Sequence, residues 1–248
     1  MNTLSISVVV PVFNEESGIQ PLAQRLANVR AFWPGRSVQF VFVNDGSVDL
    51  TEAALKRAFG DDSMCTIVSH GRNQGIGAAF RTGFIHAYGD IVCTIDADCS
   101  YGPENLKLLV DALDREQADI SVASPYHPDG RVDGVPGWRL LLSKGCSLFY
   151  QCIAPVRLYT YTSVFRAYRR RVVESIAFEE NGFVSAAEVL IRAAEQGFHI
   201  VEVPMTLHAR KIGQSKMKVL RTIRQHLGLM ARSAGGHRLP VETKYSKV

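Results

Sequence analysis

Residues 89–104 read GDIVCTIDADCSYGPE, and they give the strongest indication of the type of fold. Ile91–Ile95 is a short apolar run rich in β-branched residues, which is typical of a strand buried on both faces of a parallel sheet. Two carboxylates, Asp96 and Asp98, follow this strand directly as a D-x-D pair. Because a turn after a strand is also an ordinary place for Asp, the pair alone leaves a purely structural role open.

Similar apolar runs lie on both sides of this strand, with helical patterns between them. Further strands are expected at Ser5–Phe13, Val38–Val43, Cys65–Val68 and Ile120–Ala123, and helices at Gly18–Phe32, Asp49–Phe59, Gly75–Tyr88 and Pro103–Glu116. The alternation predicts an α/β fold, with a mainly parallel, Rossmann-like sheet flanked by helices over residues 1–123. Ligands of such sheets bind at the carboxyl ends of the strands.

The pattern changes after residue 123. Ser124–Gly137 is dense in Pro, Gly and Asp and is expected to be a long loop. Trp138–Cys152 and Val184–Gln196 are predicted helices, and Phe198–Pro204 is a late strand. Met217–Ala231 is a basic amphipathic helix, which can lie on an anionic membrane surface or dock on the core of the protein.

Composition excludes several classes of protein. The chain has 248 residues, 46% of them hydrophobic and 21% charged, so a globular fold is expected and disorder is not. Five scattered cysteines without a C-x-x-C pair indicate reduced thiols in the cytoplasm. No charge-free apolar run reaches the roughly 18 residues of a membrane span, and the first residues do not resemble a secretion signal, so neither insertion nor export is expected.

Charge is distributed unevenly along the chain. Residues 210–248 contain ten Lys or Arg and one Glu, whereas the preceding residues are mildly acidic. Such a basic segment suggests contact with phosphates of a nucleotide or a membrane surface. Nucleic acid is not an expected partner, because the segment has no interleaved aromatic residues and no known reader module.

Two other predicted strands end in polar residues, at Asn14-Glu15 and at Asn44-Asp45. In a parallel sheet these ends and Asp96 converge on one crevice, where carboxylates can hold a divalent cation together with phosphate oxygens. The glycines of residues 73–77 favour a tight turn with close helix packing over a phosphate-binding loop. The chain lacks G-x-G-x-x-G after its first strand and also lacks G-x-x-x-x-G-K-[ST], which argues against a Rossmann dehydrogenase and a P-loop NTPase.

Taken together, the motifs resemble family 2 glycosyltransferases with the A-type glycosyltransferase fold, and within them the dolichyl-phosphate mannosyltransferase or polyprenyl-phosphate sugar transferase branch. The segments that carry the resemblance are PVFNEE (11–16), NDGSVDLT (44–51), NQGIGAAFRTG (73–83), GDIVCTIDADCSYGPE (89–104), FRAYRR (165–170), GFVSAAEVLIRA (182–193) and EVPMTLHARKIGQSK (202–216). The resemblance implies inverting transfer of a mannose- or glucose-type hexose from a GDP- or UDP-sugar to a polyprenyl or dolichyl phosphate, with Mg²⁺ or Mn²⁺.

The resemblance also implies roles for single residues. The residues expected to contact the nucleotide are Pro11, Phe13, Glu15, Val43 and Asp45. Those expected at the diphosphate are Asp96, Ala97 and Asp98, with Asp96 and Asp98 as metal ligands and Asp98 as the first choice. Those expected to close over the donor phosphates are Arg210, Ser215 and Lys216. Those expected to bind the acceptor phosphate are Arg139 and Ser143, whose i, i+4 spacing places both on one helical face; the alternative is a surface Arg and an ordinary helical Ser.

Some positions depart from the family pattern. Pro125 stands where the family has an arginine, and Arg131 in the same loop is the candidate replacement. Asn44 replaces an Asp, Ser100 replaces a Gln that helps to bind metal, and Val164 replaces a Gly. These departures keep two alternatives open: a catalytically inactive nucleotide-sugar-binding subunit, and a family 2 enzyme with a different acceptor.

If the acceptor is a hydroxyl, Glu188 is the candidate base, whereas the alternative for Glu188 is an ion pair with Arg192 at i+4. The expected organisation is a catalytic domain at 1–216, with a nucleotide-sugar-binding half at 1–123 and an acceptor-binding half at 124–216. A basic helix at 217–232 and a flexible tail at 233–248 follow. We expect a peripheral enzyme on the cytoplasmic face of a membrane, with a small membrane protein as a candidate partner.

Overall fold

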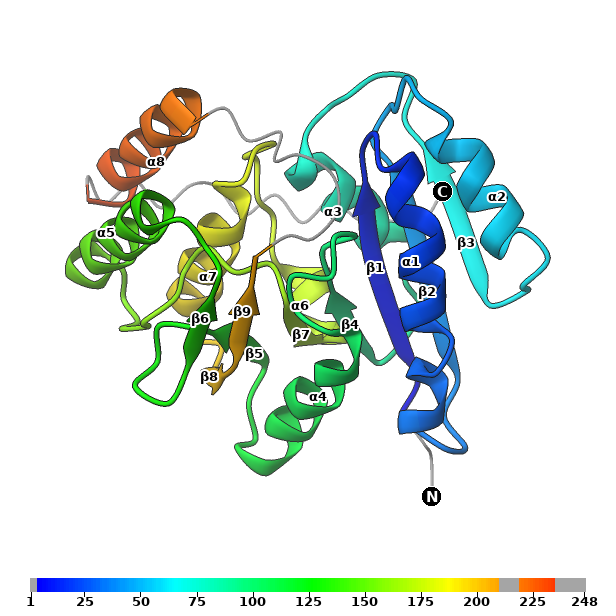
Figure 1. The fold of residues 1–248 in the computed structure, drawn as a ribbon. Coiled ribbons are helices and arrows are strands. Elements are labelled where there is room, and N and C mark those ends of the chain that lie inside the picture. Colours follow the sequence, from blue (N-terminus) through cyan, green and yellow to red (C-terminus); the bar gives the residue numbers. More distant parts are fainter. Residues whose placement is uncertain (1–3, 210–218, 235–248) are drawn as a thin grey trace.

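The computed structural model describes residues 4–209 and 219–234, and it places a seven-stranded sheet between two layers of helices (Figure 1). The strands run in the order β3-β2-β1-β4-β7-β5-β8. Their bounds are β1 Ile6–Val12, β2 Val38–Asn44, β3 Cys65–Ser69, β4 Ile91–Thr94, β5 Ile120–Ser124, β7 Arg166–Arg169 and β8 Ile200–Pro204. The predicted α/β fold with a mainly parallel sheet is therefore confirmed.

Helices cover both faces of the sheet because most of its strands are apolar on both faces. In β1, Val8 and Val10 belong to the core cluster on one face, and Val9 between them belongs to the cluster on the other. The helices of the first face are α1 Glu16–Leu26, α2 Thr51–Phe59 and α4 Leu106–Arg115. Those of the second face are α3 Ile76–His86, α5 Gly137–Ile153, α6 Arg170–Ser175, α7 Ser185–Glu195 and α8 Val219–Ala234.

Strand β7 was not predicted from the sequence. It lies between β4 and β5 and pairs antiparallel with both, whereas the other neighbours in the sheet are parallel. Its four residues, RAYR, lack a run of β-branched residues. The strand forms because it pairs on both sides with β4 and β5, which come earlier in the chain.

The structure differs from the predicted elements in three places. The helix expected at Gly18–Phe32 ends at Leu26, and a separate 3₁₀ turn follows at Val29–Phe32. The loop expected at residues 124–137 contains a short strand, β6 (Arg131–Asp133), which pairs with β9 (Thr206–His208) as a two-stranded ribbon. Helix α8 continues to Ala234, two residues into the segment expected to be a flexible tail; residues 217–218 and 235–248 lie outside the described residues. The division into nucleotide-binding and acceptor-binding halves stays a prediction.

Candidate active site

The two carboxylates of the D-x-D pair lie in a tight turn directly after β4. The Asp96 carbonyl accepts a hydrogen bond from Cys99 N at 3.3 Å, and Asp98 Oδ1 accepts one from Ser100 N at 2.9 Å. Cys99 has a φ of 52°, in the left-handed region that such a turn requires. Asp96, Ala97 and Asp98 are all partly exposed. Asp98 therefore stabilises the turn, which is the structural role that the sequence left open, and the residue is partly exposed.

The chemistry of this pair fits a divalent cation that is shared with a ligand. Carboxylate oxygens are the donors that Mg²⁺ and Mn²⁺ prefer. Within residues 4–209 and 219–234, no group of three or more His, Cys, Asp or Glu side chains is placed to hold a metal. Mg²⁺ is usually bound by one or two carboxylates together with phosphate oxygens and water, which is compatible with a pair of this kind.

The loops after β1 and β2 are joined into one rim of the crevice. Asn14 N donates to Ser47 Oγ at 2.8 Å, and Asn14 Oδ1 accepts from Val48 N at 2.9 Å. Glu15 N donates to Thr51 Oγ1 at 2.8 Å. Asn14 has a φ of 50°, a conformation that Asn tolerates better than most residues. This rim carries the predicted nucleotide contacts at Phe13 and Glu15, both of which are partly exposed.

The other predicted nucleotide contacts on these strands lie deeper. Pro11 and Val43 are direct neighbours in the β1–β2 pairing. The Val43 side chain is fully buried in the core between the sheet and α3, so it turns away from the crevice. Pro11 is partly exposed. Their contacts with a nucleotide stay predictions.

Asp45 has a structural role that the sequence did not reveal. Its side chain is only 4% exposed and accepts four hydrogen bonds from residues 70–75. Oδ1 accepts from His70 Nδ1 at 2.8 Å and from Gln74 N at 2.9 Å, and Oδ2 accepts from Asn73 Nδ2 at 2.9 Å and from Gly75 N at 2.7 Å. A carboxylate has about four acceptor positions. Asp45 therefore holds the 70–75 loop against β2, and its contact with base or ribose stays a prediction.

The glycines of this loop allow close helix packing, as predicted. Gly75 has a φ of 100°, and its amide is one of the donors to Asp45. A Cβ at Gly77 would lie 2.1 Å from the Glu180 carbonyl oxygen and 2.8 Å from Ser185 Cβ. Helix α3 can therefore meet the start of α7 only with Gly at position 77.

On the acceptor side, the structure gathers hydroxyl groups from three separate segments. Ser143 Oγ in α5 shares a 2.9 Å hydrogen bond with Thr162 Oγ1. Burial raises the pKa of Tyr126, and a hydrogen bond with Ser143 opposes that rise. Lys144 Nζ lies 5.5 Å from the centre of the Tyr126 ring. We call Tyr126, Ser143 and Thr162 the hydroxyl cluster; Arg139 belongs to the same helix, and its side chain lies outside the described part of the structure.

A buried tyrosine, Tyr101, lies within electrostatic reach of both the hydroxyl cluster and the D-x-D turn. Burial raises the pKa of Tyr101, and the charges of Tyr126 and Asp96 raise it further, against a hydrogen bond with Ser163 that lowers it. Tyr101 therefore lies within electrostatic reach of both Asp96 and Tyr126. Sequence reasoning missed Tyr101 and Thr162 as site residues, although Tyr101 lies in the 89–104 segment that carried the family resemblance and Thr162 lies two residues before Val164, which departs from the family pattern.

The β6–β9 ribbon approaches the same turn. His208 N donates to the Ser100 carbonyl at 3.0 Å, and Ala209 N donates to the Asp133 carbonyl at 2.8 Å. Arg131 is exposed and pairs with Thr206 at the far end of the ribbon from His208. Its role as a replacement for the missing family arginine stays a prediction. Arg210, Ser215 and Lys216 lie outside the described residues.

Glu188 is buried in α7 and fully engaged. It forms the expected ion pair with Arg192, with Oε1 2.7 Å from Arg192 Nη2. Its carboxylate also accepts hydrogen bonds from the amides of Glu179 and Glu180. The ion-pair interpretation is confirmed, and the role as a base stays a prediction.

Helix α5, which carries Ser143 of the hydroxyl cluster, also exposes an apolar surface. Helix α5 exposes Trp138, Leu141, Leu148 and Phe149, with Leu141 75% and Leu148 65% exposed. Helix α8 packs beside α5 (Figure 1). Tyr150 Oη and His226 Nδ1 share a 2.7 Å hydrogen bond between the two helices. Among the described helices, none is long and apolar enough to cross a membrane.

Comparison with known proteins defines the class. The family model described as "Glycosyl transferase family 2" matches residues 7–177. The polyprenol monophosphomannose synthase of Mycolicibacterium smegmatis is 33% identical over 217 residues, which are 85% of this chain and 80% of that protein. The dolichol-phosphate mannosyltransferase of Pyrococcus furiosus is 30% identical over 217 residues, 87% of this chain and 60% of that protein. The chain therefore belongs to glycosyl transferase family 2.

A solved structure confirms the expected fold. Glucosyl-3-phosphoglycerate synthase from Mycobacterium tuberculosis, crystallised with Mn²⁺, UDP and glucosyl-3-phosphoglycerate, superposes with a TM-score of 0.72. The match covers 94% of this chain and 80% of that chain at 22% sequence identity. The protein thus has the A-type glycosyltransferase fold.

Proposed function

We propose that the protein transfers a hexose from a nucleoside diphosphate sugar to a polyprenyl phosphate at a membrane surface, with inversion at the anomeric carbon. The observation that carries the proposal is the position of the hydroxyl cluster. Tyr101 interacts electrostatically with both Tyr126 of this cluster and Asp96 of the D-x-D turn, and Ser143 of the cluster comes from the same helix that exposes the apolar surface. The names of both relatives described above refer to polyprenol or dolichol phosphate chemistry, which supports the same acceptor.

The chemistry of a phosphate acceptor suits these residues. A phosphate oxygen is already anionic at neutral pH, so the attack needs no base, and Glu188 can remain in its buried ion pair. Ser143 and Tyr126 would donate hydrogen bonds to the acceptor phosphate and orient its oxygen toward the anomeric carbon. Mg²⁺ or Mn²⁺, when held by Asp96 and Asp98, would neutralise charge on the departing diphosphate. Arg210 and Lys216 are the further candidates for that task.

The membrane assignment depends on α5 and α8. An exposed apolar helix face beside basic residues is typical of segments that bind an anionic membrane interface. Lys144 on α5 and Arg224 on α8 are exposed cations next to the exposed leucines. We therefore place the enzyme on the cytoplasmic face of a membrane, where a small membrane protein is a candidate partner.

The test is transfer of radiolabelled sugar from a panel of GDP- and UDP-sugars to a short polyprenyl phosphate, with Mg²⁺ or Mn²⁺. We expect metal-dependent label in the organic phase for the wild type and its loss in Asp98→Ala. Asp61→Ala is the matched control, because Asp61 is an exposed carboxylate in the loop before β3, at the amino ends of the parallel strands, whereas Asp98 follows the carboxyl end of β4. Label found on a hydroxyl acceptor instead, or nucleotide sugar bound without transfer, would refute the proposal.

A second variant tests the acceptor site. We expect Ser143→Ala to raise KM for the polyprenyl phosphate while KM for the nucleotide sugar stays unchanged. An equal rise of both KM values would show that the hydroxyl cluster does not belong to the acceptor site.

A further inference from the structure

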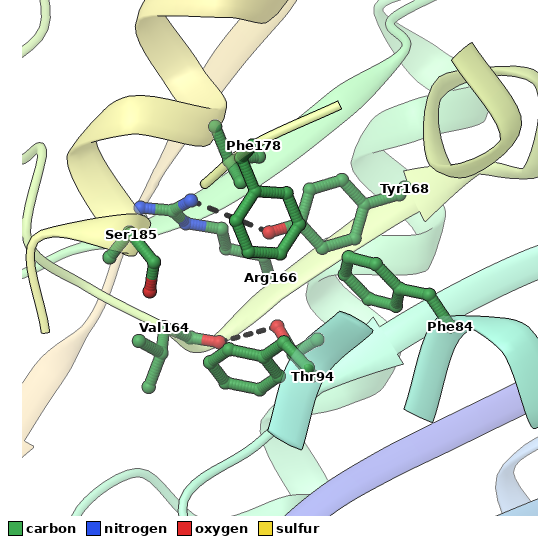
Figure 2. Close-up of a pocket in the computed structure, with 10 residues that line it drawn as sticks. Phe84, Thr94, Val164, Arg166, Tyr168, Phe178 and Ser185 are labelled. Atoms are coloured by element: carbon green, nitrogen blue, oxygen red, sulfur yellow. Dashed lines mark hydrogen bonds between the residues drawn. The ribbon is translucent and has the colours of Figure 1, made fainter. Parts of the chain in front are cut away.

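A cavity of about 10 Å³ lies between the sheet and helices α3 and α7 (Figure 2). Aromatic rings of Phe80, Phe84 and Phe178 form much of its wall. The polar side chains in its wall are Thr94, Arg166, Tyr168 and Ser185; Thr94 Oγ1 donates to the Val164 carbonyl, and Tyr168 Oη accepts from Arg166. None of the residues predicted to bind the donor or the acceptor lines this cavity.

Arg166 brings a positive charge into the interior. It is 1% exposed and is the largest fully buried side chain among those described. Nη2 donates to the Tyr161 carbonyl at 3.0 Å, and Nη1 donates to Tyr168 Oη at 3.4 Å. Nε has no acceptor among the described residues, and no described carboxylate lies within ion-pair distance of the guanidinium. Burying an unpaired charge of this kind is costly.

A second donor meets the same cavity. Ser185 is 1% exposed, and its Oγ has no hydrogen-bond partner within the described part of the chain. It is the first residue of α7, and the positive end of a helix dipole favours an anion. The first amides of α7 already donate to the carbonyls of residues 182–184, so side chains must supply the donors to a ligand. Glu188 on α7 is paired with Arg192 and does not balance Arg166.

We propose that this cavity binds a monatomic halide anion, chloride in the cell, held by Arg166 Nε–H and Ser185 Oγ–H. Arg166 supplies a positive charge and one donor, and Ser185, at the start of α7, supplies a second donor. These features match a small anion, which only accepts hydrogen bonds. The cavity has room for about one water-sized particle, which excludes phosphate and larger anions. The anion neutralises Arg166 and ties β7 to α7. This role is separate from sugar transfer and does not depend on the proposed function.

The test measures the melting temperature as sodium chloride or sodium bromide replaces sodium gluconate at constant ionic strength. A ligand that binds the folded state alone raises the melting temperature with concentration. We expect such a rise for the wild type and for the control Ser175→Ala, whose Oγ bonds to the Arg171 carbonyl. We expect Arg166→Met to abolish the rise, and Ser185→Ala to shift it to several-fold higher halide concentration.

Ser185→Ala carries the test if Arg166→Met does not fold. An absent response in the wild type, or an equal response in the wild type and Ser185→Ala, would overturn the proposal. In crystals grown with bromide, we expect an anomalous peak within hydrogen-bond distance of both donors. A water molecule at that position in such crystals would also overturn the proposal.

Discussion

Replacing Asp45 with Asn tests whether this carboxylate organises the rim of the crevice. The substitution keeps the shape of the side chain and turns one acceptor oxygen into a donor. In the least costly arrangement, the new NH₂ group takes the Oδ1 position. His70 can then change tautomer, so that its Nδ1 accepts a hydrogen bond from the NH₂ group and its Nε2 donates one to Thr82 Oγ1. The Gln74 amide is then left without an acceptor. One buried unsatisfied donor costs about 1–3 kcal/mol.

The two hydrogen bonds that remain, from Asn73 and Gly75, also lose the charge of their acceptor. Charged hydrogen bonds are worth about 1 kcal/mol more than neutral ones, so these two bonds add about 2 kcal/mol and the total loss is about 3–5 kcal/mol. We would measure it by urea unfolding at neutral pH, with Asp61→Asn as the exposed control. A loss in Asp45→Asn as small as that of the control would refute the reasoning.

The remaining predictions concern the two helices beside the acceptor side and the contact between α3 and α7. Burial lowers the pKa of His226 to about 4 from an ordinary 6.5, so the unfolded chain binds the proton more tightly. The free energy of unfolding should therefore fall by roughly 3 kcal/mol as the pH drops from about 6.5 to about 4. In His226→Asn, the midpoint of urea unfolding should not show this dependence on pH. Gly77→Ala should destabilise the protein by about 1–3 kcal/mol, because the added methyl group meets a carbonyl oxygen. Gly145→Ala, in open space on α5, should stabilise the protein by up to about 1 kcal/mol. Equal shifts in melting temperature for the two variants would contradict the packing argument. Leu141→Glu should weaken sedimentation with anionic vesicles by about tenfold or more, since a buried Leu is worth about 1.5–3 kcal/mol, and Leu108→Glu on α4 should bind as the wild type does.

The parallel strands could be predicted because each is an apolar run that needs burial on both faces. β7 could not, because RAYR has no local pattern and depends on partners far away in the sequence. The turn at Asp96 and Asp98 could be predicted because the two carboxylates, one residue apart, directly follow an apolar strand. The four-bond arrangement at Asp45 could not be predicted, since two of its donors are backbone amides, which every residue has. The contact of Ser143 with Thr162 likewise depends on how α5 packs.

The position of β7 also has a consequence for how the chain is synthesised and how it can evolve. β4 and β5 have no direct pairing in the described sheet, and β7, more than forty residues beyond β5, joins them. When the first 123 residues leave the ribosome, β4, the strand that precedes Asp96, therefore still has an open edge, which closes only after Arg169 has emerged. We expect the sugar-donor half to mature together with the acceptor half during translation. For the same reason, exchange of either half between relatives as an independent cassette should fail.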